Sequence, residues 1–223
     1  MTEPEKRPEQ TINATDLSVD QLIGQIAAVE PDVRIFVQGV SESQAGFLAG
    51  VSAHHELIIQ GSVGPMAFMA SQNAQFEVFG NAGLCCGHSL QTGSILIRGE
   101  AGNFLAAYAA GGYLAVHGRA GDQVAYGLSG ADVLVRSRCG NMAAAAMRSG
   151  TLVLGNGCGD GLGHGMTGGT IYVRGEVGAV ADNLQQGRMK ETDTIRLSLM
   201  LVRAGIKTTY EKFSVFRVRG DKG

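Results

Sequence analysis

The chain has 223 residues, 44% of them hydrophobic, which is enough for one medium domain with a packed core. It contains 34 glycines, about twice the average share, so a long-helix bundle is excluded because each glycine inside a helix costs about 1 kcal/mol. Four prolines are too few for collagen. The formal net charge of −2 gives the chain no overall basic excess, so we expect neither nucleic acid nor a membrane as a partner.

The first ten residues are polar and charged, and we expect residues 1–10 to form a disordered tail. They do not have the pattern of a signal peptide or a transit peptide, because no apolar stretch follows the charges. The four cysteines of a chain without an export signal are expected to be reduced thiols. We therefore expect a cytoplasmic protein.

Residues 11–56 are expected to form an N-terminal cap. Ser18 and Gln21 have the spacing of a capping box, which predicts a short helix over 18–29. An alternating apolar segment then predicts the strand of a first, irregular coil, offset by 22 residues from the next coil. Its apolar residues are Val33, Ile35 and Val37.

Glycine recurs every 19 residues through residues 57–189, and this period is typical of a repeat architecture. The periodic glycine, which follows another glycine by three residues except where Ser137 and Asn156 replace the first one, is expected to lie in a turn. It is expected to need the positive φ that only glycine adopts without steric cost. These turn glycines are Gly64, Gly83, Gly102, Gly121, Gly140, Gly159 and Gly178.

Two apolar columns keep the same period and stand two residues apart. Alternate residues of a strand share one face, so both columns should point inward. The first consists of Leu57, Phe76, Ile95, Leu114, Val133, Leu152 and Ile171, and the second of Ile59, Val78, Ile97, Val116, Val135, Leu154 and Val173. Next to the second column stands a mixed column that should point outward: Gln60, Phe79, Arg98, His117, Arg136, Gly155 and Arg174.

Each 19-residue unit is therefore predicted to have the order strand, turn, strand, turn. Asn103, Asp122, Asn141 and Asp160 follow the turn glycines, and we expect their side chains to bond their own backbone in a ladder of turns. Such a unit buries its apolar face only when stacked on its neighbours. The predicted fold class is an all-β solenoid, a parallel β-helix of about seven 19-residue coils with short helical caps at both ends.

Residues 190–223 are expected to form a C-terminal helix and an extended arm. Thr192 or Asp193 is expected to cap the helix, and Gly205 to end it. The apolar residues that we expect this helix to carry are Ile195, Leu199 and Val202. The alternation over 213–218 predicts a last strand or arm.

The cysteines offer little chemistry. Cys139 and Cys158 occupy the same repeat position one coil apart, which fits a metal or redox pair or a stack of small apolar side chains. The stack is favoured, because no His or further Cys shares that column. Cys85 and Cys86 are adjacent rather than spaced as C-x-x-C, which favours inert packing.

The histidines and serines do not form a catalytic set. His88 and His164 share a column but are four coils apart, too far to bind one ion, and His54-His55 is expected to be a surface pair. No serine lies in a nucleophile-elbow pattern. We therefore predict no catalytic residue, no bound cofactor and no metal ligand in this chain.

Residues 155–165 are the densest glycine segment. The segment lacks the G-x-G-x-x-G pattern and the following Lys-Ser or Lys-Thr of a phosphate-binding loop. Its position in the coil predicts tight turns and close backbone approach, or a surface where another protein or a channel comes near the main chain. Asp160 and His164 are the polar groups that would line such a surface.

Three strings carry a family resemblance: Gly118-Arg-Ala-Gly-Asp122, Tyr126-Gly-Leu-Ser-Gly130 and Gly159-Asp-Gly-Leu-Gly-His-Gly-Met-Thr-Gly-Gly169. Together with the 19-residue period they resemble the glycine-motif C-terminal domain of the glutamate synthase large subunit. The resemblance implies a right-handed β-helix without catalytic residues that bridges a glutamine amidotransferase domain and an FMN-binding synthase domain. It also suggests Asp122 as an interface residue, although Gly121 and Gln123 replace the Asn and Tyr common beside it.

The chain lacks the cysteine nucleophile and the FMN barrel of the full-length enzyme, so we expect a free-standing subunit of a hetero-oligomer. It resembles the middle subunit of N-methylglutamate synthase, which converts glutamate and methylamine to N-methylglutamate and ammonia. The resemblance implies two partners, a class II glutamine amidotransferase-like subunit and an FMN-binding glutamate synthase-like subunit. FMN and iron–sulfur clusters would lie in those partners, and this chain could line an ammonia path.

Two alternatives stay open. The chain could be the β-helix subunit of a glutamate synthase or of a formylmethanofuran dehydrogenase-type oxidoreductase. It could also be a binding scaffold with ligands on the column of Arg98, Arg136 and Arg174, although His117 and Gly155 interrupt that column.

Overall fold

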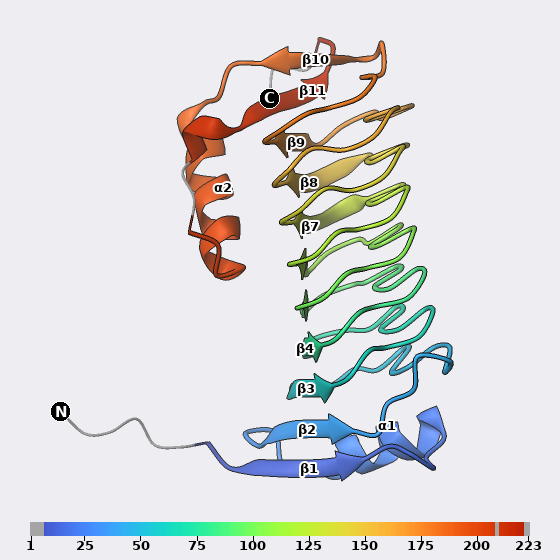
Figure 1. Ribbon diagram of the computed structural model, residues 1–223. Coiled ribbons are helices and arrows are strands. Elements are labelled where there is room, and N and C mark those ends of the chain that lie inside the picture. Colours follow the sequence, from blue (N-terminus) through green and yellow to red (C-terminus); the bar gives the residue numbers. More distant parts are fainter. Residues whose placement is uncertain (1–6, 208–209, 221–223) are drawn as a thin grey trace, which may run out of the picture.

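The computed structural model describes residues 7–207 and 210–220, and Figure 1 shows a solenoid with one strand from each coil stacked along one side. The strands are β1 (Glu9–Asn13), β2 (Arg34–Gln38), β3 (Glu56–Gln60), β4 (Gln75–Phe79), β5 (Ser94–Ile97), β6 (Tyr113–Val116), β7 (Ser129–Val135), β8 (Ser149–Leu154), β9 (Thr170–Val173), β10 (Leu184–Gly187) and β11 (Ser214–Val218). They form one sheet in the order β1 to β9, then β11 and β10. The helices are α1 (Val19–Ala27), α2 (Glu191–Arg203) and the short 3-10 helix η1 (Tyr210–Lys212).

The register of the parallel strands follows the 19-residue period. Leu57 of β3 pairs with Phe76 of β4, and the same column continues in register to Ile171 of β9. Both predicted inward columns are buried throughout and form one continuous hydrophobic core. The predicted fold class, a parallel β-solenoid of about seven turns with two short helices, is confirmed.

The N-terminal cap has the predicted helix and one strand that was not predicted. The capping box is present, because the Ser18 side chain accepts from the Gln21 N–H and Gln21 bonds back to the Ser18 N–H. The predicted strand is β2, which pairs with β3 at an offset of 22 residues. The tail predicted over 1–10 is wrong at its end, because Glu9 and Gln10 belong to β1, which pairs with β2; residues 1–6 lie outside the described residues.

The second side of each coil is not a strand, so the predicted strand, turn, strand, turn unit is wrong. Every other residue there has a positive φ near 50° to 80°, which is the left-handed region. The three left-handed columns are Gly46, Met66, Cys85, Phe104, Gln123, Met142 and Gly161; Leu48, Phe68, Gly87, Ala106, Ala125, Ala144 and Gly163; and Gly50, Ala70, Ser89, Tyr108, Gly127, Ala146 and Gly165.

Hydrogen bonds join these left-handed segments from coil to coil. The N–H groups of the outer two columns donate to the following coil, and those of the middle column donate to the preceding coil. In one coil, for example, Phe104 donates to Asp122, Ala106 to Cys86 and Tyr108 to Tyr126. The segment thus satisfies its backbone hydrogen-bonding groups without strand geometry. We call this side of the solenoid the left-handed face, and the side formed by β3–β9 the sheet face.

The C-terminal end is closed by β10 and β11, which pair antiparallel, and β11 also pairs antiparallel with β9. The parallel array therefore ends before residue 189, where it was predicted to end. Helix α2 has Lys190 as its N-cap residue, and Asp193 accepts the Lys190 N–H from the third helical position. The predicted cap at Thr192 or Asp193 is thus displaced, while Gly205 follows the helix end with a φ of +68° as expected.

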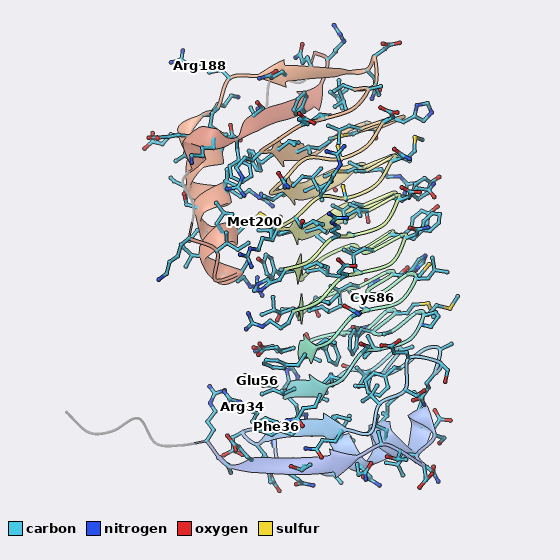
Figure 2. The ribbon with its side chains drawn as sticks, viewed as in Figure 1. Arg34, Phe36, Glu56, Cys86, Arg188 and Met200 are labelled. Carbon is cyan, nitrogen blue, oxygen red and sulfur yellow. The ribbon has the colours of Figure 1, made fainter. Side chains whose placement is uncertain are left out.

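Helix α2 lies alongside the strands rather than over the end of the solenoid (Figures 1 and 2). It covers the outer side of the sheet face and encloses a second core with β6–β9. Leu197, Met200 and Leu201 are its buried apolar residues. Ile195, Leu199 and Val202, the apolar residues noted in the sequence, face solvent instead.

Candidate interaction surfaces

A ladder of Asn and Asp side chains runs along one edge of the solenoid. The Oδ1 atom of Asn103 accepts from the Asp122 N–H at 2.9 Å, and Asp122 in turn accepts from Asn141 at 2.7 Å. The ladder continues through Asp160 to Ala179. These side chains bond the backbone of the following coil rather than their own, which corrects the predicted turn ladder.

The turn glycines are required by close contact with the preceding coil, which is made by backbone at Gly64, Gly83 and Gly102 and by ladder side chains from Gly121 onward. None of the seven has a positive φ, so the predicted left-handed turn is wrong. A Cβ on Gly121 would instead overlap the Asn103 side-chain oxygen and lie 2.8 Å from the Asn103 backbone N. Gly140 and Gly159 lie against Asp122 and Asn141 in the same way. Glycine is required because each coil rests directly on the backbone or side chain of the coil below.

The dense glycine segment is the last layer of the left-handed face. Gly161, Gly163 and Gly165 fill all three left-handed columns of that coil, which explains the alternating G-x-G-x-G pattern. The Asn183 side chain donates to the carbonyls of Met166 at 2.8 Å and Gly163 at 3.3 Å, which closes part of the exposed edge.

The predicted interface residues lie apart from one another. Asp122 and Asp160 are rungs of the ladder, two coils apart, and each accepts a backbone N–H. His164 is exposed and lines a groove of about 580 Å3 together with Met166, Val180 and other residues of the last coil. A role of these three residues at a partner interface or an ammonia path stays a prediction.

Cys139 and Cys158 are neighbours, as their shared column predicted. Both are free and buried, and a hydrogen bond between the two thiols raises the pKa of Cys139 and lowers that of Cys158. The Arg138 guanidinium donates to the Cys158 carbonyl at 2.8 Å. Cys86 is buried, and burial raises its thiol pKa to about 12, whereas Cys85 is partly exposed.

The histidines have separate environments. His54 is exposed and lines a groove with Arg7, Asp32 and Glu56. His55 is buried, with its Nε2 atom 3.0 Å from the Val29 carbonyl, so the prediction of a surface pair is wrong for this residue. The His88 Nδ1 atom lies 2.8 Å from the Ser89 hydroxyl.

Two of the three arginines of the column, Arg98 and Arg174, are engaged within the chain. Arg98 pairs with Glu77 and its guanidinium lies 5.8 Å from the ring centre of Phe79. Arg174 donates to the Gly155 carbonyl at 2.7 Å and lies 5.7 Å from the ring centre of Phe213. These contacts argue against a ligand-binding column.

Four polar contacts fix α2 on the sheet face, and sequence analysis did not identify them. The Tyr113 hydroxyl donates to the Met200 carbonyl at 2.9 Å, and Arg196 pairs with Asp132 at 2.6 Å. His117 Nε2 lies 2.9 Å from the Ala204 carbonyl, and Tyr172 donates to Asp193 at 2.7 Å. A signal was present, because the outward position between the two inward columns is apolar from β5 onward: Leu96, Ala115, Leu134, Val153 and Tyr172.

Asp193 is the most strongly held carboxylate of this contact. Burial alone would raise its pKa, but hydrogen bonds from the Lys190 N–H, the Tyr172 hydroxyl and the Arg217 guanidinium lower the pKa below the ordinary value. Arg217 forms a short ion pair with Asp193 and is itself nearly buried. The charge is therefore paired and stabilises the start of α2.

Metal-binding clusters and membrane-spanning helices are absent from residues 7–207 and 210–220. That part of the chain has no group of three or more His, Cys, Asp or Glu side chains placed to hold a metal ion. It also has no helix long and apolar enough to cross a bilayer.

Comparison with known proteins identifies the repeat. The family model described as GXGXG motif matches residues 43–215, which is most of the chain. The chain belongs to the GXGXG motif family. This is the family of the C-terminal domain of the glutamate synthase large subunit, so the resemblance seen in the sequence is confirmed and indicates a glutamate-synthase-related subunit. No curated protein matches the chain significantly.

Proposed function

We propose that the chain is a non-catalytic bridging subunit of an N-methylglutamate synthase. In this proposal it joins a class II glutamine amidotransferase-like subunit to an FMN-binding glutamate synthase-like subunit. FMN and iron–sulfur clusters lie in those partners. The observation that supports the proposal is that the polar side chains of this GXGXG chain have structural roles. The Asp and Asn ladder, two arginines of the arginine column and the anchors of α2 all hold the solenoid together.

The packing of the solenoid limits where ammonia could travel. The interior is filled by the two apolar columns, whose members have at most 2% of their surface exposed. An ammonia path along this subunit therefore runs over its outside, between the solenoid and a partner. The groove beside His164 at the last coil is the part of the surface that fits such a path.

Purification of the tagged chain from the cells that naturally make it tests the proposal. The expected result is a complex of this chain with the two partners in fixed ratio, identified by mass spectrometry. The complex should form N-methylglutamate from glutamate and methylamine. A chain that purifies as a stable monomer contradicts the proposal. Recovery with molybdopterin or tungstopterin subunits would assign it to a formylmethanofuran dehydrogenase-type complex instead. Glutamine-dependent glutamate formation without formation of N-methylglutamate would assign it to a glutamate synthase.

A further inference from the structure

Helix α2 presents a second apolar face, directed away from the sheet. Ile195, Leu199 and Val202 are 54%, 66% and 75% exposed, and their spacing of four and three residues places them in one line along the helix. They are three of the eight exposed large hydrophobic residues in the described part of the chain. We call this line the α2 stripe. A contiguous apolar line of this kind on a soluble protein marks an interaction surface.

The stripe is held in place by the opposite side of the helix. Leu197, Met200 and Leu201 already fill the second core, so α2 cannot rotate to bury the stripe without exposing them. The contacts of Met200 with Tyr113 and of Ala204 with His117 fix the helix near its C-terminal end. A surface that is rigid before binding loses little conformational entropy when a partner docks.

The segments that flank the stripe carry an excess of positive charge. Residues 188–207 carry five Lys and Arg against two Asp and Glu, whereas residues 1–187 carry nine against sixteen. Within α2 itself two Arg are balanced by Glu191 and Asp193, so the excess comes from Arg188, Lys190 and Lys207 beside the helix ends. Arg188 projects from the segment before the helix (Figure 2).

This charge argues against a second copy of the chain as the occupant. A two-fold symmetric contact places the same patch of each copy against the other. Two segments with an excess of three positive charges over residues 188–207 would then meet, and like charges across an interface disfavour association. A surface with the opposite charge would be attracted.

We propose that the α2 stripe is the docking surface for a different protein chain, whose contact surface is apolar and bordered by Asp and Glu. This inference rests on the proposed function in one respect, namely that the chain works in a complex of unlike subunits. It does not depend on which reaction that complex performs. It assigns the outer face of α2 to a partner and leaves the left-handed face free for another contact.

Photo-cross-linking within the complex purified from native cells tests the surface directly. Leu199→p-benzoylphenylalanine is compared with Leu84→p-benzoylphenylalanine, because Leu84 is also an exposed leucine (43%) but lies on the left-handed side of the coil. The expected result is a cross-link from position 199 to a segment of an unlike chain that contains apolar residues and Asp or Glu. A cross-link to a second copy, a cross-link to the same segment from position 84, or none at all would overturn the inference.

Leu199→Glu and Leu84→Glu provide the second measurement. Both add one negative charge to an exposed site, and circular dichroism should show the same fold as the unchanged chain. Leu199→Glu should reduce recovery of the cross-linked chain about tenfold or more, while Leu84→Glu should leave it unchanged. Equal recovery with both variants would overturn the inference. If the recovered chain is neither amidotransferase-like nor synthase-like, the docking surface stands and the proposed function fails.

Discussion

The sheet face and the left-handed face stack the same coils with different backbones. On the sheet face the strands are extended and the inward columns hold Leu, Ile, Val and Phe. On the left-handed face every other residue has a positive φ, yet only seven of the twenty-one positions in the three columns are glycine. The comparison teaches that glycine has two separate uses here. The turn glycines allow close contact between coils, and those of the last coil relieve an unfavourable φ.

The largest effect should come from breaking the close contact. Gly121→Val places a branched side chain where the Asn103 side chain and backbone already lie, so we expect a loss of about 3 kcal/mol in the free energy of unfolding. Val116→Ile adds one methylene to an inward column that already holds Ile97 in the neighbouring coil, and should cost about 1 kcal/mol or less. Urea denaturation of both variants measures the difference.

A double variant separates contact from φ as the reason for this glycine. Asn103→Ala removes the side chain that meets the new Cβ, so the loss caused by Gly121→Val should be smaller in the Asn103→Ala background. If a positive φ were the cause, the loss would be the same in both backgrounds.

The next largest effect concerns the outer layer of the sheet face. Asp193→Asn removes the charge that pairs with Arg217 and accepts from Tyr172, and should cost about 2 kcal/mol at neutral pH. Because the pKa of Asp193 is lowered in the folded protein, its stabilisation is present above about pH 4 and is lost as the pH falls below that value. Thermal midpoints of the two proteins should therefore converge in acid. A difference that does not shrink as the pH falls below about 4 would contradict this assignment.

The Asn and Asp ladder lies between the two faces and should contribute less. Asn141→Ala leaves the Asp160 N–H without its acceptor, but Asn141 is exposed and water can replace it, so we expect a loss of about 1 kcal/mol. Gln75→Ala, at an exposed position of β4, should change the stability by less than about 0.5 kcal/mol. If the two variants lose the same stability in urea denaturation, the ladder does not stabilise the protein.

The features that follow from local side-chain spacing were predicted from the sequence, and those that depend on contacts between coils or with α2 were missed. The spacing of residues predicts the inward columns, their register and the cap of α1. Apolar side chains at every second position and a capping box are both local patterns in the sequence. The left-handed face could not be predicted, because Met66, Phe104 and Tyr108 are residues that rarely adopt a positive φ, and the hydrogen bonds between coils that accompany this conformation form only in the folded stack. The position of α2 depends on Tyr113, Asp132 and Tyr172, which meet it only in the folded protein.

The smallest effect tests the φ of the left-handed face at one column. Gly165 and Ala146 occupy the same position in neighbouring coils, with φ of +66° and +54°. A Cβ on Gly165 would meet nothing within 4 Å, so Gly165→Ala should cost about 1 kcal/mol for conformational reasons alone. Ala146→Gly relieves the same conformation and should raise the stability by a few tenths of a kcal/mol, offset in part by the greater freedom of glycine in the unfolded chain. Thermal midpoints that shift in opposite directions would show that backbone conformation governs this face, whereas a shift of both in the same direction would show that the side chains do.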